Sequence, residues 1–366
     1  MNKRESNFDL LRVISCVAVI AIHVSCIYKD AITDIGVFGF YYTDNMLYTL
    51  LWNVLSRFAV PCFLMMSGAF LLSDERNGSV KYFYRKSLKN IGIGIILFSL
   101  FSVLFSMCKP LIKMFWGLPF RFDFIQPIIN LLKGVPYYHL WYLTVLTVIY
   151  LLIPFIIKFR NSVDNKLFDR LVLVYFAWAI LSGLTGTYFY YWSMSCVLPY
   201  LGFVLIGYKL KRNAVKDNKK GAVLIGIGLI CLMALTIIQY RHSLAGISEA
   251  EEIYTMVDAF NPMIALGSLF IFKGFSKLEI KRDFGKLPKY TFYIYMWHAL
   301  VLYFIQQGYE KYCGGLNNIV AIPVLIVIVF VLSYLLSVPS EKLVSRIASN
   351  DKLMNKVYVF LRISDK

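Results

Sequence analysis

Long apolar stretches alternate with short polar segments along nearly the whole chain. The stretches from Leu10 to Tyr28 and from Ile319 to Val338 hold about twenty residues each, and a helix of that length, rising about 1.5 Å per residue, crosses a hydrocarbon core of about 30 Å. The pattern therefore predicts an all-α integral membrane protein with ten transmembrane helices. The ten segments are residues 8–28, 47–72, 88–107, 138–157, 171–187, 195–208, 221–240, 258–272, 288–306 and 319–338.

The composition excludes a soluble domain of this size. Hydrophobic residues make up 59% of the 366 and charged residues 16%, against about 45–50% and about 25% in average soluble domains. The first apolar stretch follows Lys3 and Arg4 as a signal peptide would, but it lacks a small-residue cleavage site and contains Arg12 and His23. We therefore expect it to be retained as the first helix.

The formal net charge of +17 is explained by topology and does not require nucleic-acid binding. With the N-terminus inside, 29 of the 38 Lys and Arg residues fall in inner segments and seven in outer loops, while Arg12 and Arg57 lie within helices. This asymmetry predicts a multi-pass protein of the cytoplasmic membrane with both termini cytoplasmic. Residues 1–338 are expected to form one transmembrane domain, and residues 339–366 a basic amphipathic cytoplasmic tail on the inner leaflet.

Arg12 and His23 are the first candidates for chemistry, because polar groups inside a bilayer are costly and need a cavity or a partner. Their separation of 11 residues places them on one face of a helix, about 16 Å apart along its axis. An imidazole can act as a general base near neutral pH, and the cation suits a phosphate. The alternative is that Arg12 extends to the inner headgroups beside Asp9 while His23 is a hydrogen-bonded core residue.

A basic cluster, Arg85, Lys86 and Lys89, is expected at the cytoplasmic start of the third helix. Three cations near a positive helix dipole end would form a phosphate site. The alternative is ordinary anchoring to the inner leaflet.

Other polar groups within the predicted helices are weaker candidates. His298 is expected near mid-depth in the ninth helix, and His139 precedes Trp141 and Tyr142 at the outer mouth of the fourth, where an aromatic belt is the alternative explanation. Ser67 and Gly68 suit either close helix packing or a narrow passage for a pantetheine arm. The seven cysteines occur singly, so neither a metal site nor a disulfide is predicted.

Several of these residues fall in motifs that resemble one family. Phe8 to Arg12 with His23 resembles the Arg-x10-His signature of the acyltransferase-3 family of bacterial membrane O-acyltransferases. The resemblance extends over essentially the whole chain, through residues 61–68, the basic start of the third helix, His139 to Leu143, and Tyr293 to His298. Five motifs in this order favour a functional role for Arg12 and His23 over the structural alternative.

The resemblance implies an acyl-coenzyme A user that acylates, and most often acetylates, hydroxyl groups of cell-envelope glycans or lipid-linked sugars. By that resemblance His23 is the catalytic histidine and Arg12 its partner. Lys86 and Lys89 match the family's Arg-x-x-Arg positions near the coenzyme A phosphates, but lysine lacks the bidentate fork of arginine, which Arg85 would partly restore.

The remaining candidates take roles by the same resemblance. The pantetheine passage would lie at Ser67, and the acceptor path would be lined by His139, Trp141, Tyr142 and His298. The alternative for His139 or His298 is to orient His23. The expected partners are acyl-coenzyme A, the sugar acceptor and membrane lipids, with no metal. The rival hypothesis is a binding or transport domain for a small substrate such as an amino acid, or the membrane half of a longer enzyme.

Overall fold

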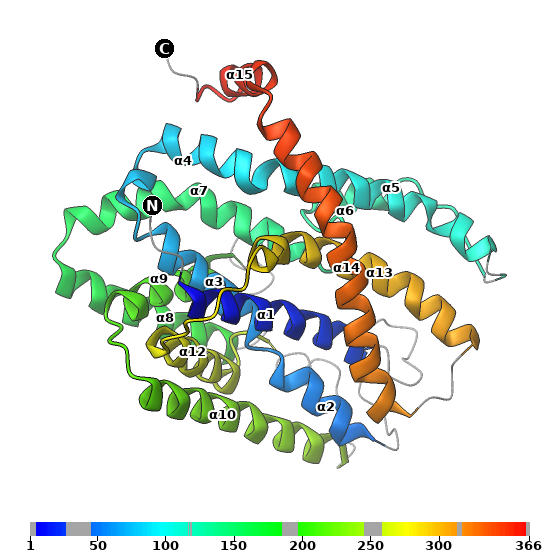
Figure 1. Ribbon diagram of the computed structural model, residues 1–366, viewed down its shortest axis with the longest axis horizontal. Coiled ribbons are helices and arrows are strands. Elements are labelled where there is room, and N and C mark those ends of the chain that lie inside the picture. Colours follow the sequence, from blue (N-terminus) through cyan, green and yellow to red (C-terminus); the bar gives the residue numbers. More distant parts are fainter. Residues whose placement is uncertain are drawn as a thin grey trace. The chain divides into compact units, whose positions relative to one another are not determined.

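The structure is a computed structural model that describes residues 5–26, 45–115, 117, 119–184, 197–244, 258–312 and 317–363. These residues are mostly helical, and none of them forms a strand (Figure 1). The chain divides into two compact units. Unit 1 comprises Met1–Ser73 and Val163–Leu335, and unit 2 comprises Asp74–Ser162 and Leu336–Lys366.

The helices of unit 1 are α1 (Ser6–Ser25), α2 (Met46–Leu55), α3 (Ala59–Leu71), α8 (Asn165–Leu184), α9 (Val197–Arg212), α10 (Asn218–Leu244), α12 (Pro262–Lys277) and α13 (Leu287–Tyr312). Those of unit 2 are the 3-10 turn η2 (Glu75–Gly78), α4 (Val80–Ser87), the π-helical turn η3 (Leu88–Gly92), α5 (Ile93–Phe115), α6 (Gln126–Leu132), α7 (Trp141–Ser162) and α15 (Asp351–Phe360). Helix α14 (Asn318–Ala348) begins in unit 1 and ends in unit 2.

Six helical segments of the described chain are long and apolar enough to cross a membrane: Ser6–Ser25, Met46–Leu71, Val80–Phe115, Trp141–Ser162, Asn218–His242 and Asn318–Ala348. The other four predicted segments fall mainly on α8, α9, α12 and α13. Residues 185–187 and 195–196 of these segments lie outside the described residues, and residues 258–261 precede the start of α12. Helices α9 and α12 have 16 residues each, fewer than the about 20 that a span needs, and tyrosines and His298 lower the apolarity of α13. The count of ten spans and the cytoplasmic location of both ends stay predictions.

The segment predicted as one helix over residues 47–72 is broken into α2 and α3. The break has a chemical cause in Pro61, which has no backbone N–H to donate to the carbonyl of Arg57 one turn earlier. Arg57 therefore lies in the short turn between the two helices.

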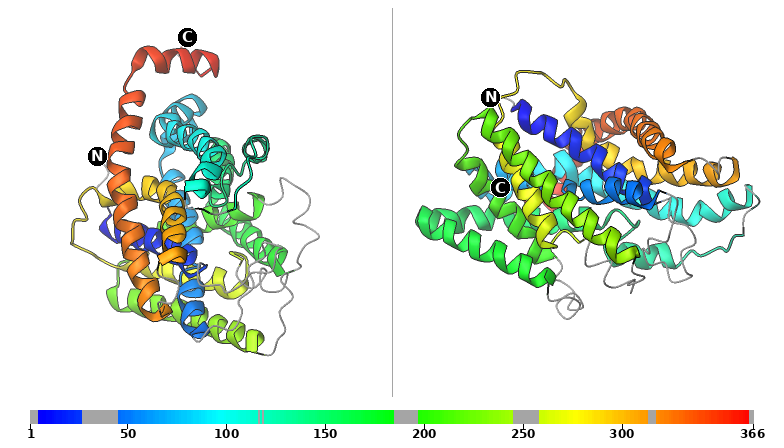
Figure 2. Two further views of the ribbon diagram at one scale, coloured as in Figure 1. Left: turned by 90° about the vertical axis from the view of Figure 1, so that its right-hand side faces the viewer. Right: turned by 90° about the horizontal axis from the view of Figure 1, so that it is seen from below.

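Helix α1 packs against α2, α3, α12 and α13 in unit 1. The buried Phe8 ring contacts Phe70 of α3 and Phe272 of α12, with ring centroids 5.3 and 5.4 Å away. Asn7 donates a hydrogen bond of 2.8 Å to the carbonyl of Phe275. Helix α10 runs along α12 and α2 (Figure 1, Figure 2).

Glycines allow the closest helix contacts in unit 1. A Cβ atom added at Gly68 of α3 would lie 1.8 Å from the backbone oxygen of Val204 in α9, and one at Gly207 would lie 2.2 Å from the backbone oxygen of Met65. Such distances are far below van der Waals contact, so α3 and α9 meet backbone to backbone. Close packing, the commoner use of a Ser-Gly pair in membrane helices, is thus what Gly68 provides.

Alanine at Gly68 is expected to destabilise unit 1, because the backbones of α3 and α9 must separate to admit the methyl group. Overpacking of this kind typically costs about 1–3 kcal/mol. Gly226 of α10 gives a matched control, since no atom lies within 4 Å of a Cβ added there. Thermal unfolding of the detergent-solubilised protein should show a lower midpoint for Gly68→Ala and no loss for Gly226→Ala. Equal midpoints for the two variants would contradict the packing account.

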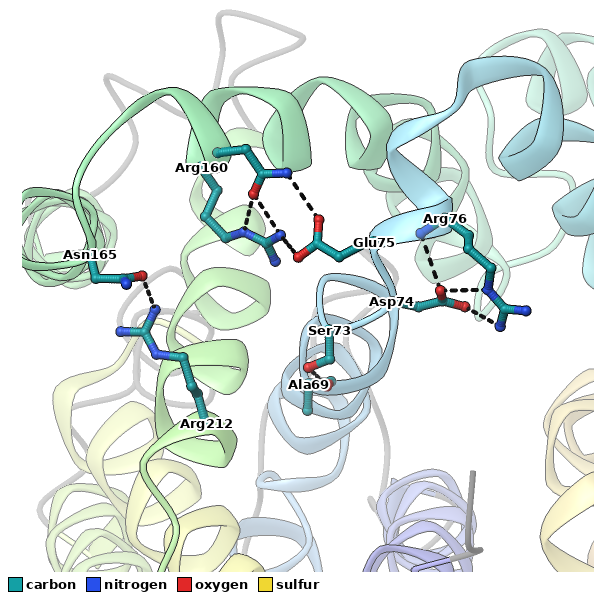
Figure 3. A network of polar contacts seen from close by, with 9 residues as sticks. Ala69, Ser73, Asp74, Glu75, Arg76, Arg160, Asn165 and Arg212 are labelled. Carbon is teal, nitrogen blue, oxygen red and sulfur yellow. Dashed lines mark hydrogen bonds and ion pairs between the residues drawn. The ribbon is translucent and has the colours of Figure 1, made fainter. Parts of the chain in front are cut away.

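Unit 2 is held together where α7 meets η2 and α4. Arg160 of α7 is almost completely buried and forms an ion pair with Glu75 of η2 (Figure 3). Asn161 donates a hydrogen bond of 2.9 Å to the other oxygen of the same carboxylate. A buried guanidinium needs such a partner, because an uncompensated charge inside a protein is costly. Phe83 of α4 is fully buried against the Tyr150 ring of α7.

The C-terminal region of unit 2 is helical on both sides of a short turn. Helix α14 passes through Pro339 and continues to Ala348, so the predicted division after residue 338 does not coincide with a helix end. Helix α15 follows, with Asn350 capping its N-terminus by accepting from the amide of Leu353. It buries Met354 and Tyr358, one turn apart, and exposes Lys352 and Lys356, which makes it amphipathic.

Candidate active site

The interior of unit 1 brings two histidines from opposite ends of the sequence together. His23 lies in the last turn of α1 and is half-buried, whereas His298 of α13 is completely buried. The ring centroids are 5.1 Å apart and the ring planes are tilted by 37°. His298 thus lies against His23, and of these two residues His23 is the less deeply buried.

The hydrogen bond made by His298 fixes which of its nitrogens carries the proton. Its Nδ1 bonds to the carbonyl oxygen of Tyr295, one turn earlier in α13. Because a carbonyl can only accept, Nδ1 must donate, and Nε2 carries the lone pair when the ring is neutral. The backbone of α13 therefore sets both the tautomer and the orientation of the imidazole that packs on His23.

Asn53 of α2 connects the end of α1 to Arg57. Its Nδ2 donates hydrogen bonds to the hydroxyl of Ser25, at 2.9 Å, and to the carbonyl of Ile22, at 3.3 Å. His23 lies between these two residues in the sequence. The Oδ1 of Asn53 accepts from Nε and Nη2 of Arg57, at 3.1 and 2.8 Å.

Asn53 was not among the residues predicted from the sequence. It is completely buried, and its side chain uses both its donor and its acceptor in the described contacts. The signal that was available is a polar residue one helical turn before a cation inside an apolar stretch, a spacing at which side chains meet.

Arg12 lies on α1 with Asp9, which precedes it by one turn. The nearest described atoms, Nη1 of Arg12 and Oδ1 of Asp9, are 3.7 Å apart, and one third of the Arg12 side chain is exposed. This ion pair is the contact expected from the structural alternative. It does not exclude a phosphate partner, because an arginine fork has donors for more than one acceptor.

Ser67 lies within α3 and donates its hydroxyl to the carbonyl of Phe63, at 3.0 Å. A hydrogen bond to the carbonyl of the preceding turn is common for a serine inside a helix. Its side chain is partly exposed, and nothing in its contacts activates it as a nucleophile.

The basic cluster Arg85, Lys86 and Lys89 belongs to unit 2, and its position in the helix differs from the prediction. The helix begins at Val80, so Arg85 and Lys86 lie in the last turn of α4 and Lys89 in the π-helical turn that follows. Since a helix dipole acts mainly within the first turn, it adds little at these positions, and the phosphate-binding role of the cluster stays a prediction. The side-chain charges remain, and π-helical turns are frequent at functional sites.

Each cation of the cluster has a partner within unit 2. Arg85 donates a hydrogen bond of 2.6 Å to the carbonyl of Ile363, and its guanidinium lies 5.0 Å from the ring centre of Tyr358. Lys86 lies 3.3 Å from Asp74, and Lys89 lies 3.6 Å from the highly exposed carboxylate of Asp351. A bound phosphate would have to share or replace these contacts.

Asp74, the partner of Lys86, is itself held in place, because it accepts hydrogen bonds from both the backbone amide and the guanidinium of Arg76 (Figure 3). Hydrogen bonding, chiefly from the Arg76 side chain and also from Lys86, lowers the pKa of Asp74 from 3.8 to about 2. Any stability that this depressed pKa contributes is complete above pH 3.8 and is lost as the pH falls through about 2. At neutral pH Lys86 therefore faces a carboxylate that is fully charged.

His139, Trp141 and Tyr142 also belong to unit 2, at the start of α7. His139 and Tyr142 are buried, and the His139 ring lies 5.5 Å from the ring centre of Tyr137. Trp141 keeps partial exposure, so in this structure it is the only one of the three with an appreciable accessible surface.

A comparison with protein families assigns the chain. A family model described as an acyltransferase domain matches residues 5–338, nearly the whole length. The chain belongs to the acyltransferase-3 family. A curated protein similar in part is an amino-acid racemase of Enterococcus faecalis, 28% identical over 148 residues, which cover 39% of this chain and 17% of the racemase. No solved structure matches.

Within this member of the acyltransferase-3 family, the predicted site residues fall into two sets. Unit 1 holds Arg12, His23, Ser67 and His298, and of these the structure brings His23 and His298 into contact. Unit 2 holds the basic cluster together with His139, Trp141 and Tyr142. The described residues contain no group of three or more His, Cys, Asp or Glu side chains placed to hold a metal ion.

Proposed function

We propose that this acyltransferase moves an acetyl group from acetyl-coenzyme A to a hydroxyl of a cell-envelope glycan or a lipid-linked sugar. The observation that carries the proposal is the histidine pair, in which half-buried His23 is backed by a fully buried histidine whose tautomer is fixed. A general base needs a defined orientation. The family membership supports acyl transfer as the reaction.

In the proposed reaction His23 takes the proton of the acceptor hydroxyl, and the oxygen bonds to the thioester carbonyl carbon. The carbon–sulfur bond then breaks, and the coenzyme A thiolate leaves and receives the proton. His298 does not touch the reacting atoms in this scheme. It is a positioning residue, because the hydrogen bond from its Nδ1 to Tyr295 holds the ring on which His23 packs.

The donor and acceptor contacts are part of the same proposal. Arg85, Lys86 and Lys89 are proposed to bind the coenzyme A phosphates, Arg12 to assist His23, and Ser67 to border the pantetheine arm. His139, Trp141 and Tyr142 are proposed to contact the acceptor. The protein is proposed to lie in the bacterial cytoplasmic membrane with both termini inside, as the excess of basic residues in the predicted inner segments favours.

Release of the coenzyme A thiol tests the donor directly. Membranes that contain the protein should release free thiol from acetyl-coenzyme A faster than membranes from cells with an empty vector, provided that envelope material is present as acceptor. A rate equal to the empty-vector rate, with the protein present and folded, would contradict the proposed donor.

A second candidate function is binding or transport of a small substrate such as an amino acid, and the partial similarity to an amino-acid racemase favours it. In that case the chain would correspond to part of a longer enzyme or to a free-standing binding domain. Saturable binding of an amino acid by purified protein, without any acyl transfer, would select this function.

A further inference from the structure

Arg57 is a charged side chain inside the Met46–Leu71 span, where a cation is costly unless it has a function or a partner. Its two described hydrogen bonds go to the amide oxygen of Asn53. An amide oxygen orients a guanidinium, so these two bonds fix the direction in which Arg57 points. Arg57 also keeps part of its side-chain surface accessible.

The position of Arg57 is set relative to His23 by one amide group. Asn53 bonds Arg57 with its oxygen, and with its nitrogen it bonds the hydroxyl of Ser25 and the carbonyl of Ile22. His23 lies between these two residues on α1. The stretch of α1 that carries His23 and the Arg57 guanidinium are thereby hydrogen-bonded to the same buried side chain.

We infer that Arg57 is the anion-binding residue of the His23 site, and that Asn53 is the positioning residue that holds it there. This inference rests on the proposed function for the identity of the anion. When the acceptor oxygen adds to the thioester carbonyl, the electron pair of the C=O bond moves to oxygen, and the guanidinium donates to the resulting oxyanion. When the carbonyl re-forms, the thiolate leaves and takes the proton held by His23.

The same site chemistry fits a second anion. A guanidinium beside an imidazole also binds the carboxylate of an amino acid, which is the class of substrate in the alternative function. The two sources are distinguishable, because the oxyanion exists only during transfer and a carboxylate binds at rest.

Arg57→Gln removes the charge and keeps hydrogen-bonding capacity, so it is the test variant. In the thiol-release assay we expect kcat to fall about 10²–10³-fold, with the KM for acetyl-coenzyme A changed far less, as for the loss of an oxyanion donor. Arg57→Lys keeps the charge and should recover part of the lost rate. Arg241→Gln, the same change at an exposed position of α10, is the matched control and should leave the rate unchanged.

Amino-acid binding provides the second arm. The parent protein and Arg57→Gln are titrated calorimetrically with a panel of amino acids and with the matching amino alcohols, which lack the carboxylate. The difference in affinity between each acid and its alcohol measures whether the resting site binds a carboxylate. Carboxylate-dependent binding that is lost in Arg57→Gln, from a protein without transfer activity, would overturn the proposed acyl transfer and support Arg57 as the anion site.

Two outcomes would overturn the inference itself. The first is a folded Arg57→Gln protein, verified by circular dichroism and gel filtration, that retains the parental kcat or the parental amino-acid affinity. The second is an Arg57→Lys protein no more active than Arg57→Gln, because a charge at this position would then not be what the site uses. A parent that neither transfers nor binds a carboxylate would overturn the inference together with both functions.

Discussion

Replacing His23 by glutamine is expected to slow acyl transfer by about 10²–10⁴-fold, the usual contribution of a general base. Glutamine has similar bulk and can hydrogen-bond, but it cannot take a proton from a hydroxyl near neutral pH. The protein should still insert, purify as a folded species and bind coenzyme A, because the contacts of Asn53 with Ile22 and Ser25 do not involve the His23 ring. Thiol release by the parent and the variant measures the difference.

The same substitution at His242 is the matched control, since this histidine lies near the end of α10 and is not among the predicted site residues. His242→Gln should retain the parental rate. A folded His23→Gln protein that transfers acyl groups as fast as the parent would show that His23 is not the base, and the binding or transport function would then be favoured.

Exchanging Lys86 and Lys89 together for alanine is expected to weaken acyl-coenzyme A binding by about tenfold for each lysine. Hydrogen bonds to charged groups contribute roughly 1.5–3 kcal/mol each, and about 1.4 kcal/mol corresponds to a factor of ten in affinity. Folding should survive, because Asp74 keeps its bonds from Arg76 and the carboxylate of Asp351 is 83% exposed. Titration of the purified double variant with acetyl-coenzyme A measures the affinity.

The double change of Lys219 and Lys220 to alanine is the control, since it removes two cations from the start of α10, outside the predicted donor site. It should leave the affinity unchanged. If the Lys86 and Lys89 variant also binds acetyl-coenzyme A at the parental affinity, these lysines serve only to anchor the helix to the inner leaflet.

Hydropathy predicted the helices of this fold well and their interruptions poorly. Each of the ten predicted segments is largely helical in its described residues, because runs of about twenty apolar residues leave the backbone no other way to satisfy its hydrogen bonds in lipid. The break before α3 depends on the missing donor of Pro61, which an apolarity scale does not register. The start at Val80 was missed because the first turns of that helix carry polar residues, although they form the same backbone bonds.

Of the candidate site, the sequence supplied His23 and His298 but not their contact. That contact depends on how α1 packs against α13, and packing between distant segments is not determined by the spacing of either one. Arg57 was recognised as a buried cation, whereas its connection to α1 through Asn53 required the structure. The phosphate-binding role of the basic cluster rests on the family resemblance, because its side chains contact protein groups in the described residues.

Mass spectrometry of envelope glycans tests the central claim most directly. Glycans from cells with the intact gene should carry acetyl esters that are missing both in cells without the gene and in cells that express only His23→Gln. The esters should also disappear on mild alkaline treatment, as O-acetyl groups do. Identical glycan masses in all three strains, with the protein present in the membrane, would contradict acyl transfer to the cell envelope.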